Sequence, residues 1–175
     1  MKDNLILIGM PGVGKSTVGV ILAKVLGYQF IDSDLIIQQQ EGCLLSEIIS
    51  KQGVDGFIET ENRVNAGILA GHAVIATGGS AVYGKEAMEH LKSIGTVLYL
   101  EASYPVLEKR LTDIRGRGVV LKDGQNLYDI YKERTPLYEK YADIRIHEAG
   151  LEIEQTVSQI MEKIKNLNSN HKSNE

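Results

Sequence analysis

The residues best suited to do chemistry lie in a glycine-rich segment near the start of the chain. Residues 9–16 read Gly-Met-Pro-Gly-Val-Gly-Lys-Ser and match the pattern G-x-x-x-x-G-K-[ST]. Glycines let backbone N–H groups point at phosphate oxygens, the lysine can bridge β- and γ-phosphates, and the serine hydroxyl can ligate Mg²⁺. A tight turn between a strand and a helix would also use glycines, but it would not need Lys15 and Ser16 at this offset. The segment predicts a site for a nucleoside triphosphate and Mg²⁺, with contacts from Gly12, Val13, Gly14, Lys15, Ser16 and Thr17.

Asp32 and Asp34 form a second candidate group, because they follow a short stretch that is predicted to be a strand. Both would then lie at the same edge of the sheet as the glycine-rich segment. Asp32 is placed to hold a magnesium-bound water. Asp34 is placed to orient an acceptor hydroxyl and to take its proton late in a phosphoryl transfer. Alternatively, either aspartate caps the helix that follows.

A buried strand and a helix must hold the glycine-rich segment in place. Residues 5–8 are Leu-Ile-Leu-Ile, a run typical of a strand covered on both faces. Apolar residues recur at helical spacing over 15–26, and Gly27 supplies a stop. The alternation continues, with strands predicted at 29–32, 73–77, 96–100 and 144–146 and helices at 34–40, 45–51, 54–70, 85–93, 105–111, 125–141 and 153–167. Five such strands predict a doubly wound α/β fold with a parallel sheet, in which ligands bind at the carboxyl ends of the strands.

Two segments break this alternation. Residues 113–124 contain three glycines and several charges without periodicity, and a loop of this length in a compact domain is typical of a mobile lid. Residues 168–175 are polar and are predicted to be disordered. Because no repeat or linker interrupts the rest, we expect a single domain over residues 1–167.

Charge and cysteine content narrow the functional class. The chain has 175 residues, 43% of them hydrophobic, and its 19 basic and 23 acidic residues give a net charge of −4. Proteins that coat nucleic acids are normally basic, so no nucleic-acid partner is expected. Four of the six arginines lie between Arg110 and Arg134, which favours a small anionic ligand at a local positive patch.

The same arithmetic bears on compartment and assembly. The single cysteine, Cys43, cannot form an internal disulfide, and the histidines are scattered, which fits a reducing cytoplasmic compartment without a Cys/His metal site. The apolar stretch before Gly9 is too short for a signal peptide or a membrane span, so no membrane association is expected. The chain has no heptad seam, and we expect a monomer.

In combination these features resemble the shikimate kinase family, within the nucleoside-monophosphate-kinase-like branch of P-loop proteins. The resemblance runs from about Asn4 to His147 and rests on residues 9–17 with Gly19 and Ala23, Phe30-x-Asp32-x-Asp34, Phe57 with Glu61, Thr77-Gly78-Gly79, Arg110-Leu111, Arg117, and Glu133-Arg134-x-Pro136-Leu137-Tyr138. It implies a three-layer P-loop kinase fold whose five-stranded parallel sheet has the order 2-3-1-4-5. It also implies a substrate-binding helical insertion at about 34–70 and a lid at about 112–124. The implied reaction transfers the γ-phosphoryl group of MgATP to shikimate and yields shikimate 3-phosphate and ADP.

The resemblance implies roles for individual residues on the nucleotide side. Lys15 acts on the transferred phosphoryl group, and Ser16 and Asp32 hold Mg²⁺. Arg110 lies against adenine. Arg117 reaches from the lid to the phosphates and joins Lys15 as a catalytic residue.

On the acceptor side, the resemblance makes Asp34 the catalytic residue that meets the hydroxyls of shikimate. Gly79 contacts the substrate through its backbone, and Arg134 binds the substrate carboxylate. Glu61, which in the family orients an arginine, is implied near the substrate, where it could instead bind a hydroxyl or an amine. The alternative for Arg134 is a surface salt bridge with a neighbouring glutamate.

Three segments depart from the family pattern. Ile58 stands where the family has an arginine that pairs with the substrate carboxylate, and Ser80 replaces the third glycine of the strand end. Residues 117–119 read Arg-Gly-Val in place of arginine-proline-leucine. Removing one charged partner from a buried carboxylate costs roughly 2–5 kcal/mol of binding, which is enough to change a substrate. Arg63 and Lys51 are candidates to replace the missing charge.

These departures leave alternatives open for the function. The acceptor could be a related hydroxy acid, a polyol or a hydroxy amino acid. A regulator that binds ATP without transferring phosphate is a further alternative, although such a protein has no need of Asp34. A nucleoside-monophosphate kinase would require a base-reading pocket that these residues do not indicate.

Overall fold

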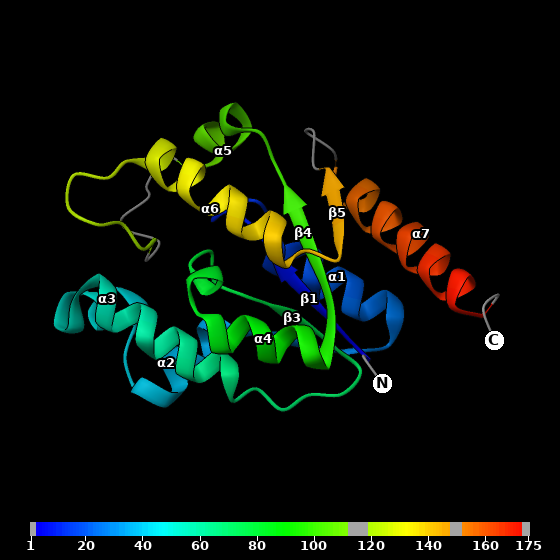
Figure 1. Ribbon diagram of the computed structural model, residues 1–175, viewed down its shortest axis with the longest axis horizontal. Helices are drawn as coiled ribbons and strands as arrows, with labels where there is room; N and C mark the ends of the chain where they lie inside the picture. Colours follow the sequence, from blue (N-terminus) through cyan, green and yellow to red (C-terminus); the bar gives the residue numbers. More distant parts are fainter. Residues whose placement is uncertain (1–2, 112–118, 148–151, 173–175) are drawn as a thin grey trace.

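A five-stranded parallel sheet forms the centre of the molecule (Figure 1). The computed structural model describes residues 3–111, 119–147 and 152–172, the last five of these by their backbone alone. The strands are β1 Asn4–Ile8, β2 Gln29–Asp32, β3 Ala73–Ala76, β4 Gly95–Glu101 and β5 Ile144–His147. They lie in the order β2-β3-β1-β4-β5, which confirms the expected P-loop kinase topology.

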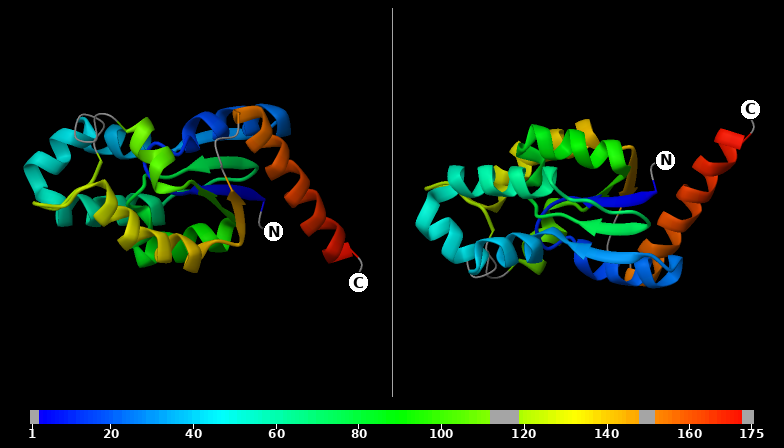
Figure 2. Two further views of the ribbon diagram at one scale, coloured as in Figure 1. Left: turned by 90° about the horizontal axis from the view of Figure 1, so that it is seen from above. Right: turned by 90° about the horizontal axis from the view of Figure 1, so that it is seen from below.

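Helices cover both faces of this sheet and make the fold three-layered. They are α1 Lys15–Leu26, α2 Ser33–Glu41, α3 Leu45–Ala66, α4 Lys85–Ile94, α5 Tyr104–Arg110, α6 Leu127–Tyr141 and α7 Ile153–Lys172, with a short 3₁₀ turn, η1, at Ala81–Tyr83. Figure 2 shows α1 and α7 on one face and α4 and α6 on the other. Because α2 begins directly after β2, α2 and α3 extend from the edge where the strands end.

The central strands owe their apolar sequence to burial on both faces. Every residue of β1 and of β3 is buried, and Ile6 of β1 lies beside Ile75 and Val97 of its two neighbours. The edge strand β5 instead alternates buried and exposed residues. The glycine-rich segment therefore leaves the most central strand of the sheet, where its backbone is held firmly.

The insertion after β2 is helical, as expected, and it bends at one residue. Gly53 has φ of 73° and ψ of 177°, which breaks α3 between the two helices that the sequence predicts at 45–51 and 54–70. Glycine adopts this conformation without the steric cost that a side chain would impose. The second part of α3 ends at Ala66, four residues earlier than predicted, because Gly67 follows it.

The C-terminal helix α7 is longer than the sequence predicts. The backbone of α7 stays helical to Lys172, whereas the sequence analysis ends this helix at Leu167 and expects disorder from residue 168. The difference has a simple reason, since neither glycine nor proline follows Leu167 to stop the helix.

Of the expected lid, residues 119–124 have no regular secondary structure, and 112–118 lie outside the described residues. Among the described helices, none has the length and apolar character that crossing a bilayer requires.

Candidate active site

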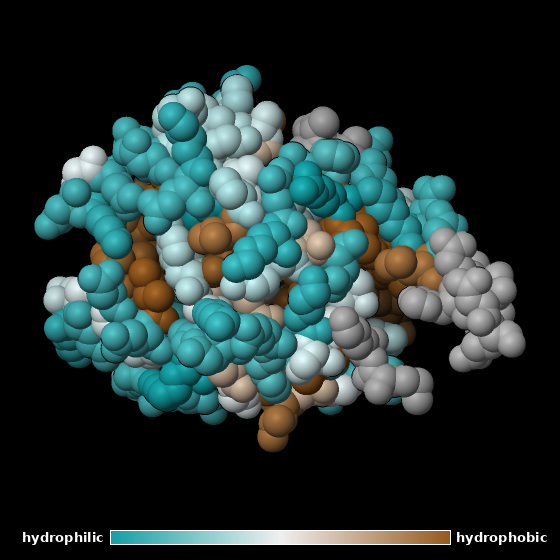
Figure 3. Space-filling model, viewed as in Figure 1, coloured by the Kyte–Doolittle hydropathy of each residue, from teal (hydrophilic) through white to brown (hydrophobic). Residues whose placement is uncertain are grey.

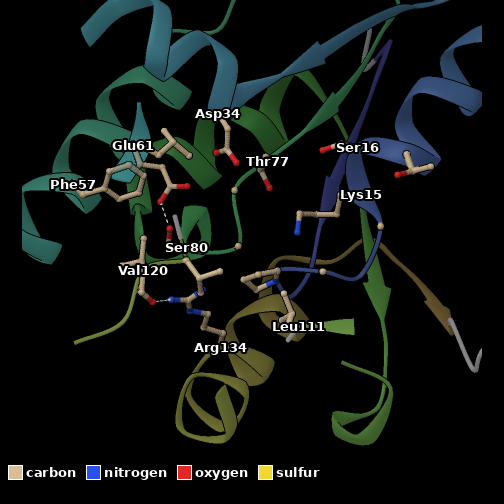
Figure 4. A pocket seen from close by; sticks show the side chains of 18 residues that line it. Lys15, Ser16, Asp34, Phe57, Glu61, Thr77, Ser80, Leu111, Val120 and Arg134 are labelled. Carbon is tan, nitrogen blue, oxygen red and sulfur yellow. Dashed lines mark hydrogen bonds between the residues drawn. The ribbon is translucent and has the colours of Figure 1, made fainter. Parts of the chain in front are cut away.

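A cavity of about 350 Å³ lies at the carboxyl ends of the strands, where the glycine-rich segment, α2, α3 and α6 meet (Figure 4). It brings together most of the residues that the sequence singles out. Figure 3 shows a largely hydrophilic face with hydrophobic side chains in the hollow between α3 and the chain that leads into α6. Predicted site residues that line the cavity are Gly12, Gly14, Lys15, Ser16, Thr17, Asp34, Glu61, Gly79 and Arg134.

The glycine-rich segment is a tight loop that positions Lys15 at the first turn of α1. Gly9 has φ of 147°, and a Cβ there would stand 2.6 Å from the backbone oxygen of Leu100. Gly12 has φ of 76°, and a Cβ there would collide with the Leu111 side chain at 2.8 Å. These close approaches explain why the loop needs glycine. The side chain of Val13 is buried in the core, and its N–H donates to the Met10 carbonyl over 3.3 Å.

The side chain of Lys15 is held inside this loop by hydrogen bonds that phosphate oxygens could replace. Its Nζ donates to the carbonyl oxygens of Gly9, at 2.8 Å, and Met10, at 3.0 Å. Burial lowers the pKa of Lys15 to about 8, and the nearby Asp34 carboxylate partly offsets that effect. A buried ammonium that has only neutral partners gains when phosphate oxygens replace them.

Asp32 caps the helix that follows it, and the same carboxylate lies beside Ser16. Its Oδ2 accepts a hydrogen bond of 2.8 Å from the Ser16 hydroxyl, and its Oδ1 caps α2 by accepting from the Asp34 N–H at 3.0 Å. The cap fixes the carboxylate beside the serine. Two hard oxygen donors side by side fit Mg²⁺, which takes its remaining ligands from phosphate and water. In the described parts of the chain, no group of three or more His, Cys, Asp or Glu side chains could hold a metal on its own.

Asp34 and Glu61 face each other across Gly78. A Cβ on Gly78 would stand 2.8 Å from the Asp34 Oδ1 and closer still to the Glu61 Oε1, so a side chain at this position would displace one or both carboxyl groups. Burial, and then the neighbouring Asp32, raises the pKa of Asp34 to about 6, while Lys15 opposes the shift. A carboxyl group with this pKa is ionised at neutral pH and is poised to accept a proton.

Glu61 is the more deeply buried of the two carboxylates. Its Oε2 accepts a hydrogen bond of 2.5 Å from the Ser80 hydroxyl, whereas its Oε1 is buried without a hydrogen-bond partner among the described residues. Burial raises the pKa of Glu61 to about 8, and the Ser80 hydrogen bond counteracts part of this rise. From the sequence, Ser80 is expected either to narrow the pocket or to offer it a hydroxyl; in the structure this hydroxyl donates its hydrogen bond to Glu61.

Arg134 is buried in α6 and does not form the surface salt bridge that was its alternative. Its side chain is 1% exposed, and Glu139 pairs instead with Arg145 at 3.1 Å. Its Nη2 donates to the Val120 carbonyl at 2.6 Å, and its Nε donates to the Tyr83 hydroxyl at 3.2 Å. Within the described chain, Nη1 is buried without a partner. Such a guanidinium lacks only an anion to complete its hydrogen bonds.

The candidates for the missing positive charge do not reach the cavity. Arg63 pairs with Glu41 at 2.7 Å, and its side chain is 61% exposed. Lys51 is exposed on α3. Ile58 packs with Phe57 and Val120 in a small apolar cluster beside the cavity. In the described part of the chain, Lys15 and Arg134 are the basic side chains that line it.

The remaining predicted residues divide between the two ends of the site. Gly79 lies against Pro11 of the glycine-rich loop, and its carbonyl accepts a hydrogen bond of 2.6 Å from the Tyr138 hydroxyl. Arg110 Nη1 donates to the Val13 carbonyl at 3.3 Å, which places the guanidinium on the outer side of the loop. Arg117 and its neighbour Arg115 lie outside the described residues.

A family model described as shikimate kinase matches residues 11–165. The chain belongs to the shikimate kinase family. A shikimate kinase from Haemophilus influenzae is 38% identical over 172 residues, which are 95% of each chain, and shikimate kinase 2 from Yersinia pestis is 34% identical over 173 residues, 94% of each. The shikimate kinase from Acinetobacter baumannii, solved in complex with shikimate, superposes with a TM-score of 0.84 at 31% identity and covers 94% of this chain and 93% of that one. The shikimate kinase from Aquifex aeolicus gives 0.77 at 30%, with 93% and 96% covered. The resemblance inferred from the motifs is confirmed over nearly the whole chain.

Two contacts of this shikimate kinase family member are not evident from its sequence. Tyr83 and the backbone of Val120 hold Arg134, yet they lie 51 and 14 residues away from it in the chain. The clue available for Tyr83 is its position directly after the strand-end segment Gly78 to Ser80, where an aromatic side chain can border the site. Nothing in the sequence around Val120 points to a role for its carbonyl.

Proposed function

We propose that this protein transfers the γ-phosphoryl group of MgATP to a hydroxyl group of shikimate, yielding shikimate 3-phosphate and ADP. The observation that carries the proposal is the pairing, within one cavity, of Lys15 at the phosphate end with the unsatisfied Arg134 guanidinium at the other. A ligand that joins the two ends must present phosphate to one and an anion such as a carboxylate to the other. Shikimate and ATP together have this chemistry.

The phosphate end would act by positioning and charge. We assign the N–H groups of the glycine-rich loop and Thr17 to phosphate contacts, and Lys15 to the oxygens that gain charge during transfer. Ser16 and Asp32 are assigned to Mg²⁺, which when bound neutralises and aligns the phosphates. Arg110 is assigned to the nucleotide, and Arg117 to the phosphates from the lid.

The acceptor end would orient the hydroxyl that attacks. Asp34 accepts its hydrogen bond, and as the new P–O bond forms and the bond to ADP breaks, the proton passes to the Asp34 carboxylate. Arg134 anchors the carboxylate, while Glu61 and the Gly79 backbone fix the ring. Holding the acceptor in line supplies much of the rate enhancement in reactions of this class.

A coupled assay of ADP formation tests this proposal. Purified protein with MgATP should form ADP many times faster when shikimate is added, and Lys15→Ala should abolish that increase. A conservative variant of an exposed lysine, Lys85→Arg, serves as the matched control and should behave as wild type. A rate with shikimate no higher than with ATP alone would remove shikimate as the acceptor.

A second acceptor class is favoured by two positions of this chain. Ile58 supplies no charge, and Ser80 engages the Glu61 carboxylate that an arginine would otherwise neutralise. A related hydroxy acid, a polyol or a hydroxy amino acid could satisfy Asp34 and Glu61 with its own donors. A panel of such compounds in the same assay separates the two classes, because only the true acceptor raises the rate above background. ATP binding without turnover on any of them would favour a regulator instead.

We also propose that the protein acts as a monomer in the cytoplasm, without nucleic-acid or membrane partners. The acidic net charge and the single cysteine support this. Light scattering after size exclusion should give the mass of one chain. A mass of two or more chains would contradict the monomer.

A further inference from the structure

The guanidinium of Arg134 is supported by neutral groups. Tyr83 accepts from Nε at 3.2 Å, and its ring centroid lies 5.2 Å from the Arg134 Cζ; Val120 accepts from Nη2 through its backbone. Figure 4 shows Arg134 directed from α6 toward Val120 and toward the side of the cavity that holds Ser80 and Glu61. No carboxylate within the described residues forms a salt bridge with this buried arginine.

This support has a consequence for ligand binding. A carboxylate partner would neutralise the guanidinium, and a substrate would then have to compete with it. A phenol and a carbonyl fix the orientation of the fork but leave its charge available. The unpartnered Nη1 is the atom on which that charge can act.

Tyr83 also lies near Ile58, the position at which the arginine of the family pattern is missing. Ile58, Tyr83 and Arg134 border the same small cavity of about 80 Å³, next to the main one. The position that carries a second arginine in the family pattern thus lines the same small cavity as the tyrosine that holds the remaining arginine. Tyr83 is the last residue of η1, the turn that follows Ser80, and it contacts Arg134 from there.

We propose that Tyr83 is a positioning residue for acceptor binding, which fixes the Arg134 fork so that one arginine, instead of two, can bind the acceptor carboxylate. The inference rests on the proposed function, because the ligand is the acceptor of that reaction. Burial raises the pKa of the half-buried Tyr83, so its hydroxyl keeps its proton at neutral pH. The oxygen can then accept from the Arg134 Nε–H.

The test compares Tyr83→Phe, which removes the hydroxyl and keeps the ring, with the control Tyr128→Phe on the exposed side of α6. We expect the KM for shikimate to rise about tenfold or more in Tyr83→Phe, as for loss of a hydrogen bond to a charged group. The kcat and the KM for ATP should stay within about twofold, because ground-state and transition-state binding weaken equally. Adding Ile58→Arg to Tyr83→Phe should lower the KM for shikimate again.

An acceptor KM in Tyr83→Phe that equals that of Tyr128→Phe would overturn the inference. So would a joint loss of kcat, ATP binding and melting temperature, since that would make Tyr83 a residue of the fold alone.

A second readout does not depend on the acceptor. In protein labelled with ¹⁵N arginine, the Arg134 Nε–H signal, assigned by its loss in Arg134→Lys, should exchange slowly with water. In Tyr83→Phe it should shift and exchange faster, and an unchanged signal would overturn the inference. If wild type fails to phosphorylate shikimate, the proposed function fails, and this signal still decides whether Tyr83 holds Arg134.

Discussion

The Ser80 hydroxyl donates a hydrogen bond of 2.5 Å to the Oε2 of Glu61, and both groups are buried. The bond ties the loop after β3 to the long helix α3, and among the described residues the second carboxylate oxygen of Glu61 is buried without a hydrogen-bond partner. A glycine at position 80 would leave both oxygens without this support. Ser80 therefore shapes the acceptor end of the site as well as narrowing it.

Replacing Ser80 by alanine should weaken acceptor binding. The hydrogen bond lowers the pKa of Glu61, so its loss should raise that pKa further, favour the neutral acid and leave the side chain less firmly oriented. We expect the KM for shikimate to rise roughly three- to tenfold, with the KM for ATP unchanged, because the nucleotide end is untouched. Steady-state kinetics give both constants. The exposed Ser93→Ala is the matched control, and equal values for the two variants would show that the bond has no part in binding.

Gly78 should tolerate no side chain. The Cβ of Gly78→Ala would press on the carboxylates of Asp34 and Glu61, two groups that the account assigns to the acceptor. We expect kcat/KM for shikimate to fall about a hundredfold, since displacing an orienting group by about 1 Å costs that much. Gly71→Ala, where nothing lies within 4 Å of the added Cβ, should retain full activity. Similar activity in both variants would mean that the two carboxylates do not need their present separation.

The pH profile should report Asp34. Its pKa of about 6 lies above the ordinary value of 3.8, so the side chain takes up its proton at a higher pH than a solvent-exposed aspartate. Because the charged form is the proton acceptor, kcat/KM for shikimate should fall about tenfold per pH unit below pH 6. At high pH a second decline should begin near 8, where Lys15 loses its proton and Glu61, whose pKa is also about 8, becomes charged. An acid limb centred near pH 4 would contradict this assignment.

Asp34→Asn should lower the turnover and raise the melting temperature at pH 7. Residual turnover should drop about 10²- to 10⁴-fold and lose the acid limb, as expected when a general base is removed. The folded state holds the Asp34 proton more tightly than the unfolded chain, so wild-type stability declines as pH rises from 3.8 to about 6. The variant should therefore melt at a higher temperature than wild type at pH 7, and the difference should vanish near pH 4. A variant that melts lower at pH 7 would show that the carboxylate stabilises the fold. Calorimetry at both pH values makes the comparison.

The nucleotide end of the site was predictable because its signals are local. Lys15 and Ser16 follow a glycine pattern within eight residues, and Asp32 follows its strand directly. Short spacing fixes the geometry of such groups whatever surrounds them. The alternation of buried strands and helices likewise sufficed for the fold class, because burial on both faces leaves a continuous apolar run.

The acceptor end depends on contacts between distant segments. Arg134 is buried where η1, α3 and α6 meet. Its hydrogen bond to Tyr83 and the hydrogen bond between Ser80 and Glu61 form in the same place. The periodicity of the sequence does not indicate contacts between distant segments. From the sequence alone, Arg134 could equally have been a surface residue. The same limit applies to Arg63, which the sequence offers as a stand-in and which pairs with Glu41.

Transfer of label from ATP to shikimate decides whether this protein phosphorylates shikimate. The protein would be incubated with shikimate and ATP carrying ¹⁸O in the γ-phosphoryl group, and the products analysed by mass spectrometry. We expect one new product, shikimate 3-phosphate, that carries three labelled oxygens, because the phosphoryl group moves intact and the fourth oxygen comes from the acceptor hydroxyl. Labelled inorganic phosphate with unmodified shikimate would contradict it.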